Sequence, residues 1–140
     1  MTIPAKLPLR GRRNAYFGEE WQFTVADPDT GIEGPVDLTG FSASLQLRLY
    51  GAQPGSAKVT LSNVGGNVEG VWIIDPTEGR VQILATEATL RSTYDDLSPD
   101  VEPGSDIILA YDLVLRDDNG MDDVWVEGSF TLSPGVTVDG

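Results

Sequence analysis

The sequence of 140 residues contains no cysteine and no histidine. Without cysteine there is no disulfide framework and no thiolate ligand for a metal ion. Without either residue there is no ordinary zinc site, no nucleophile paired with an imidazole, and no imidazole proton shuttle near neutral pH. Long apolar runs are missing too, since none approaches the ~20 residues of a membrane helix and the N-terminus lacks a signal-peptide stretch. We therefore expect a soluble chain that has no membrane partner, is not exported through a signal peptide and folds without covalent cross-links.

Positive charge is scarce and unevenly spread. The sequence has nine Lys and Arg residues and 22 Asp and Glu residues, which gives a net charge of −13 at pH 7. Four of the nine cations lie within the first thirteen residues: Lys6, Arg10, Arg12 and Arg13. The remaining five cations and 22 acids carry a net charge of −17. Because such an acidic body repels phosphate backbones, we expect no nucleic-acid partner.

The basic N-terminal stretch has two prolines and no sustained periodicity. This pattern predicts an arm at residues 1–14 in front of a single domain at residues 15–140. One hypothesis is that Lys6, Arg10, Arg12 and Arg13 form a partner interface against an acidic surface of a neighbouring subunit, because complementary potentials favour specific assembly. The alternative is a disordered, solubilising tail.

Alternation of apolar and polar residues predicts a fold built from strands. The longest signal covers Ile107 to Leu132, where two runs of period two flank a polar turn that contains Asn119-Gly120, as in a hairpin. Further strands are expected at residues 21–25, 41–49, 57–61, 71–74 and 80–84, and the last two are expected to form a hairpin around residues 75–79. Seven or so short strands with almost no helix predict an all-β, antiparallel β-sandwich, with an open β-barrel as the alternative.

One short helix is expected after these strands. Thr86 is placed to cap it and Glu87 suits its first turn, so we predict one or two turns that end near Leu90. Residues 91–106 contain five acids and two prolines and are expected to form a long loop. A loop of this length is either functional or disordered.

The acidic residues do not predict an active site. Neighbouring acids occur at Glu19-Glu20, Asp95-Asp96 and Asp122-Asp123. A carboxylate hydrolase needs two facing carboxyl groups, whereas neighbours in a strand point to opposite faces and neighbours in turns are solvated. Residues 117–123 offer clustered oxygen ligands for calcium, but their spacing differs from an EF-hand loop and a hairpin turn explains them as well. We expect no catalytic residue, no cofactor and no assigned metal ligand, and we leave calcium open for this turn and for the acidic loop at residues 91–106.

The three tryptophans receive different interpretations. Trp21 is in step with Phe23 and Val25 and is expected in the core. Trp125 is out of step with the apolar residues of its strand, so it is expected on the opposite face, either as an exposed partner interface or under a second packed layer. An exposed Trp125 or Trp72 also fits a carbohydrate-binding β-sandwich module.

The order of several segments resembles a known family. These are Pro35-Val36-Asp37-Leu38-Thr39-Gly40-Phe41, Gly79-Arg80-Val81-Gln82-Ile83, Thr86-Glu87-Ala88-Thr89-Leu90, Tyr111-Asp112-Leu113-Val114-Leu115, and Gly128 through Pro134-Gly135-Val136-Thr137. Over roughly residues 15–138 the chain is similar to the immunoglobulin-like N-terminal domain of upper baseplate and tail-fibre attachment proteins of tailed bacteriophages. It departs from that pattern at residues 51–70 and 91–106.

The resemblance implies an immunoglobulin-like β-sandwich with a structural role and no catalytic residues. We expect a non-enzymatic virion component, assembled in the host cytoplasm as a homo-oligomer, that contacts other tail, baseplate or capsid proteins. A tail, baseplate or fibre-attachment protein is the main expectation, and a capsid decoration protein or a carbohydrate-binding module is the alternative. Residues 136–138 are a candidate for strand exchange between chains or for pairing within their own domain.

Overall fold

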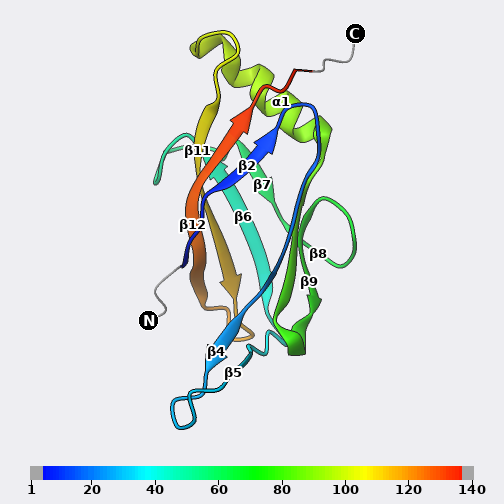
Figure 1. Ribbon diagram of the computed structural model, residues 1–140, viewed down its shortest axis with the longest axis vertical. Coiled ribbons are helices and arrows are strands. Elements are labelled where there is room, and N and C mark those ends of the chain that lie inside the picture. Colours follow the sequence, from blue (N-terminus) through cyan, green and yellow to red (C-terminus); the bar gives the residue numbers. More distant parts are fainter. Residues whose placement is uncertain (1–4, 137–140) are drawn as a thin grey trace.

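Two β-sheets packed face to face dominate the structure, a computed structural model that describes residues 5–136 (Figure 1). In chain order the strands are β1 (Ala5–Lys6), β2 (Leu9–Arg12), β3 (Phe17–Gln22), β4 (Thr24–Ala26), β5 (Glu33–Pro35), β6 (Ser42–Arg48), β7 (Val59–Leu61), β8 (Asn63–Val64), β9 (Gly70–Asp75), β10 (Arg80–Ala85), β11 (Ile107–Arg116) and β12 (Asp122–Ser133). One α-helix, α1 (Glu87–Leu97), and two 3-10 turns, η1 (Pro76–Glu78) and η2 (Ser98–Asp100), complete the described elements. The predicted all-β sandwich with one short helix is confirmed.

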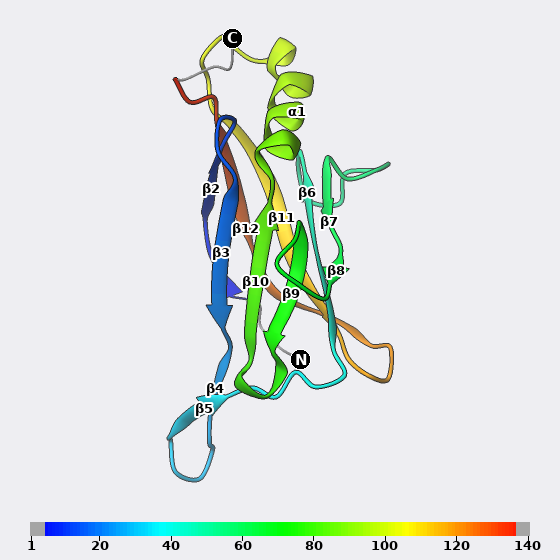
Figure 2. The same ribbon diagram turned by 90° about the vertical axis from the view of Figure 1, so that its right-hand side faces the viewer.

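The larger sheet has the order β1-β12-β11-β6-β7, with β2 also paired to β12, and the smaller sheet has the order β3-β10-β9-β8. Figure 2 shows the two sheets as layers, with α1 across one end and the β4–β5 ribbon projecting from the other. The central pairs are antiparallel, as predicted. At the edges, β1 and β2 run parallel to β12, and β8 runs parallel to β9.

The predicted hairpin at residues 107–132 forms the centre of the larger sheet as β11 and β12. Its inward row on β11 is buried: Ile107, Leu109, Tyr111, Leu113 and Leu115. Ala43, Leu45 and Leu47 of β6 continue this face, and Val71, Val81 and Ile83 of the smaller sheet cover it. Each fully buried aliphatic side chain contributes about 1.5–3 kcal/mol relative to exposure, so this shared core holds the sheets together.

The helix is longer than the sequence predicted. Thr86 caps α1, because its hydroxyl accepts a hydrogen bond from the Thr89 N–H at 3.3 Å, but the helix continues to Leu97 instead of ending near Leu90. Leu90, Tyr94 and Leu97 recur at helical spacing and are all buried. Burial of this stripe against the end of the sandwich extends the helix, so residues 91–97 of the expected loop are α-helical and residues 98–100 form η2. Within residues 5–136 no helix has the length and apolar character needed to cross a bilayer.

The described N-terminal residues belong to the larger sheet, so the prediction of an arm outside the domain is wrong for them. β1 and β2 both pair with β12, and the Arg13 N–H donates to the Ser133 carbonyl at 2.8 Å. Leu9 is buried, and a Cβ on Gly11 would lie 2.6 Å from the Phe130 ring. A parallel edge strand needs no hairpin turn, so no local turn signal announces this pairing. Residues 137–138, which were predicted for strand exchange, lie outside the described residues.

Candidate functional site

Lys6 and Arg12 are exposed on the outer edge of the larger sheet. The Lys6 ammonium lies 3.3 Å from the Glu127 carboxylate of the adjacent strand, and Arg12 pairs through its backbone with Ser133. Exposed ion pairs of this kind contribute only about 0–1 kcal/mol. The two cations are therefore held in place by strand pairing more than by charge.

Arg10 and Arg13 contact acids of their own domain. Arg10 lies 3.4 Å from the Asp106 carboxylate. The Arg13 guanidinium donates to both carboxylate oxygens of Asp95 in α1, at 2.8 and 3.2 Å. These hydrogen bonds lower the pKa of Asp95. Part of the positive charge predicted to meet a neighbouring subunit thus meets acids of the loop and helix that follow the smaller sheet.

Trp125 does not lie on the outer face of its strand, where the alternation predicted it. The register of β11 and β12 pairs Leu113 with Val126 and Val114 with Val124, so Trp125 is the extra residue of a β-bulge. The bulge turns its side chain inward, where the ring makes edge contacts with Phe23 and Phe41 at centroid distances of 5.2 and 6.3 Å. Trp125 therefore packs against the core as a half-buried ring and does not stand free on the outer face.

In the acidic turn of the β11–β12 hairpin, the carboxylates of Asp117 and Asp122 accept hydrogen bonds from groups of the same hairpin. Asp117 accepts hydrogen bonds from the N–H groups of Asn119 and Met121, both at 2.9 Å. Asp122 accepts from Arg116 at 2.7 Å, and this hydrogen bond lowers the pKa of Asp122. Among residues 5–136 no group of three or more acids is arranged to hold a metal ion. The hairpin-turn interpretation of residues 117–123 matches these contacts.

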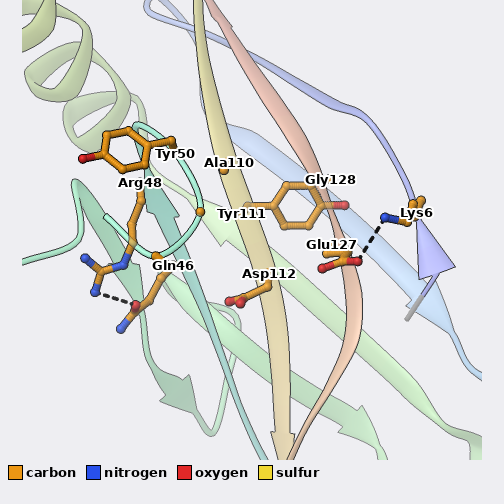
Figure 3. A pocket seen from close by; sticks show the side chains of 11 residues that line it. Lys6, Gln46, Arg48, Tyr50, Ala110, Tyr111, Asp112, Glu127 and Gly128 are labelled. Carbon is orange, nitrogen blue, oxygen red and sulfur yellow. Dashed lines mark hydrogen bonds and ion pairs between the residues drawn. The ribbon is translucent and has the colours of Figure 1, made fainter. Parts of the chain in front are cut away.

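A hollow of about 460 Å³ lies on the outer face of the larger sheet. Strand register places Gln46 beside Asp112, Asp112 beside Glu127, and Glu127 beside Lys6, so one polar row crosses four strands. Figure 3 shows Asp112 between the hydrogen-bonded Gln46–Arg48 pair and the Lys6–Glu127 ion pair. This arrangement presents hydrogen-bond donors and acceptors side by side.

Asp112 and Glu127 are like charges on directly opposed strand positions. Desolvation raises the pKa of Asp112, the charge of Glu127 raises it further, and Arg48 opposes both effects. Like charges at such positions destabilise a sheet by a few tenths of a kcal/mol up to about 1 kcal/mol. The hollow thus holds a carboxyl group in a strained electrostatic environment with a cation on either side of the pair.

A loop fixed by Arg48 forms one wall of this hollow. The Arg48 guanidinium donates to the carbonyls of Gln53 and Gly55 at 2.8 and 2.7 Å. Ala52 in this loop has a φ of 60°, and it is the one non-glycine residue between 5 and 136 with a positive φ. Such a conformation costs about 1–2 kcal/mol for a residue with a Cβ. The loop also holds Tyr50, whose side chain is 57% exposed at the rim of the hollow.

A second exposed feature is the β4–β5 ribbon, which projects beyond the sandwich (Figure 2). The chain leaves the smaller sheet after Gln22, so Val25 does not share the core with Trp21 and Phe23 as predicted. Val25 is 59% exposed and Ile32 is 70% exposed. The ribbon therefore displays apolar side chains far from the core.

Local hydrogen bonds give this ribbon a defined shape. Asp27 accepts from the N–H groups of Asp29 and Thr30 at 2.8 and 3.3 Å, and Gly31 has the positive φ of 72° that the turn requires. At the base, the Val36 N–H donates to the Phe23 carbonyl at 2.9 Å. The β4–β5 ribbon, with the turn between its strands, is thus an ordered projection.

The sequence did not single out Gln46, Arg48, Asp112 or Tyr50. The alternation of the sequence placed the first three on the polar face of their strands. The residues that lie opposite them on adjacent strands depend on strand register, which alternation does not determine. Comparison with known proteins adds no assignment: no protein-family model matches the chain, and curated proteins give no match.

Proposed function

We propose that this protein is a non-enzymatic structural component of a tailed-bacteriophage virion, placed at the tail, the baseplate or the fibre attachment. It acts through contacts with copies of itself or with other virion proteins. The sequence resemblance over residues 15–138 motivates the virion assignment. The β4–β5 ribbon is the structural observation that supports a role in protein contacts.

The ribbon supports this role for an energetic reason. A two-stranded ribbon is marginally stable in water when nothing packs against it. Each apolar side chain that a partner covers contributes about 25 cal/mol per Å² of buried apolar surface. Val25 and Ile32 are exposed on this projecting element. A partner that covers them therefore forms a complex in which this apolar surface is buried, which stabilises the complex relative to the separate chains.

The proposal is tested with phage particles assembled from wild-type and variant chains. We expect the double substitution Val25→Ser and Ile32→Ser to lower the amount of the protein in purified particles, because it removes the apolar contact without touching the core. The matched control is Val68→Ser with Met121→Ser, which changes two other exposed apolar residues of 56% and 68% exposure. Incorporation is measured by quantitative mass spectrometry, and melting curves verify that both variants fold.

Two outcomes contradict the proposal. The first is absence of the protein from purified particles that otherwise assemble. The second is equal incorporation of the ribbon variant and the control, which would remove the ribbon as the contact. Separate analysis of tails and heads distinguishes the tail assignment from the alternative of a capsid decoration protein.

A further inference from the structure

The hollow around Asp112 is one part of a longer groove. A second hollow of about 440 Å³ lies beside it on the same face of the larger sheet, and Gln46 and Asp112 line both. The second hollow extends along β6 to Ser42 and along β11 to Arg116. We call the two together the outer groove. From Ser42 to Arg48 it spans six strand steps, or about 20 Å at ~3.3 Å per step.

We propose that the outer groove binds a neutral oligosaccharide chain. This inference does not depend on the virion assignment, because it uses only the residues of this face. The carbohydrate-binding alternative thus moves from the tryptophans to this face, since Trp125 is half-buried against the core and Trp72 lies on the smaller sheet.

The side chains of the groove suit a polyhydroxylated ligand. Gln46 and Asp112 lie next to each other on neighbouring strands and bear planar groups that can meet two neighbouring hydroxyls at once, and Arg48 holds the Gln46 side chain in place. Tyr50 stands at one end with its ring more than half exposed, where it can stack on the apolar face of a sugar ring. A concave surface with a few placed polar groups and one aromatic wall is a ligand-binding arrangement.

Charge restricts the ligand class. The groove mixes the cations Lys6, Arg48 and Arg116 with the acids Asp112, Asp122 and Glu127, so no single sign dominates it. The chain as a whole has a net charge of −13, which repels anionic polymers. A neutral sugar chain avoids that repulsion.

A protein or peptide partner fits the groove less well. Interface hot spots are large apolar or aromatic anchors, whereas the apolar residues on the groove floor are small, such as Ala110 and Val114. Strand addition needs a free sheet edge, and the groove runs over β6 and β11, which are both paired on each side. The groove therefore favours a ligand bound by polar side chains.

The test is isothermal titration of the purified chain with neutral tetrasaccharides of glucose (α- and β-linked), N-acetylglucosamine, galactose and mannose, with tetragalacturonate as the anionic comparison. We expect at least one neutral tetrasaccharide to bind with a Kd below about 1 mM. Tyr50→Ala and Gln46→Ala should each weaken this binding about tenfold. The matched control is Tyr16→Ala, because Tyr16 is 70% exposed, directly precedes β3 of the smaller sheet and lies outside the groove.

Four outcomes overturn the inference. One is that no neutral tetrasaccharide binds. Another is that Tyr16→Ala weakens binding as much as Tyr50→Ala does. The third is that tetragalacturonate binds more tightly than every neutral sugar. Backbone amide shifts on sugar addition give an independent readout, since they should cluster on β6 and β11, and shifts confined to the smaller sheet would also refute the assignment.

Discussion

Gly128→Ala tests the packing of the N-terminal strands on β12. A Cβ at this position would lie 2.5 Å from the carbonyl oxygen of Leu7 and 3.0 Å from its carbonyl carbon. Ordinary contact begins at 3.4 Å, so the Leu7 backbone has to move by about 0.9 Å. Because the obstacle is backbone, no side-chain rotation relieves the clash.

The magnitude follows from two hydrogen bonds that this displacement breaks. The Leu7 N–H donates to the Glu127 carbonyl at 3.0 Å, and the Tyr111 hydroxyl crosses over Gly128 to donate to the Leu7 carbonyl at 2.5 Å. Each is worth about 0.5–1.5 kcal/mol net, so Gly128→Ala should lower the free energy of unfolding by about 1–3 kcal/mol. Urea denaturation followed by circular dichroism measures this change.

A double-mutant cycle isolates the cause. The same substitution is made in a chain that lacks residues 1–8, where Leu7 is absent and β2 is retained. There the effect should be smaller, because only the backbone strain of alanine at φ 159° remains. Gly34→Ala is the control, since a Cβ at Gly34 has no neighbour within 4 Å, and it should change stability by less than about 0.5 kcal/mol. An equal loss from Gly128→Ala in the full-length and shortened chains would refute the packing of Leu7 on Gly128.

Three further predictions address the groove and the helix. Because the pKa of Asp112 is raised in the folded state, its ionisation opposes folding as the pH rises above the ordinary value of 3.8. Asp112→Asn should therefore increase the free energy of unfolding at pH 7 by about 0.2–1 kcal/mol, with no gain near pH 3, and an equal gain at both pH values in urea titrations would contradict this. Ala52→Gly should stabilise the chain by roughly 0.5 kcal/mol by relieving the positive φ, net of the entropy of glycine, and a lower melting temperature would contradict this. Thr86→Ala should lower stability by about 1 kcal/mol through loss of the α1 cap while Thr86→Ser retains it, and equal melting temperatures would disprove the cap.

The central strands were predictable because their information is local. Ile107 to Leu115 and Ala43 to Leu47 alternate strictly, and one face of each is buried as the alternation requires. Thr86 was also readable as a cap, since capping depends on a side chain three residues from the amide that it binds. The length of the helix was not predictable, because its last turns are stabilised by contacts of Tyr94 and Leu97 with the sandwich and not by helix propensity.

The interaction surfaces depended on longer-range effects. A single bulge at Trp125 reversed the face that alternation assigned to its ring, and the departure of the chain after Gln22 moved Val25 from the expected core into solvent. The neighbours of Asp112 come from strands far apart in the sequence, and register alone brings them into one row. Periodicity states which face of a strand is buried, but only the packed sheets decide which residues lie beside each other across that face.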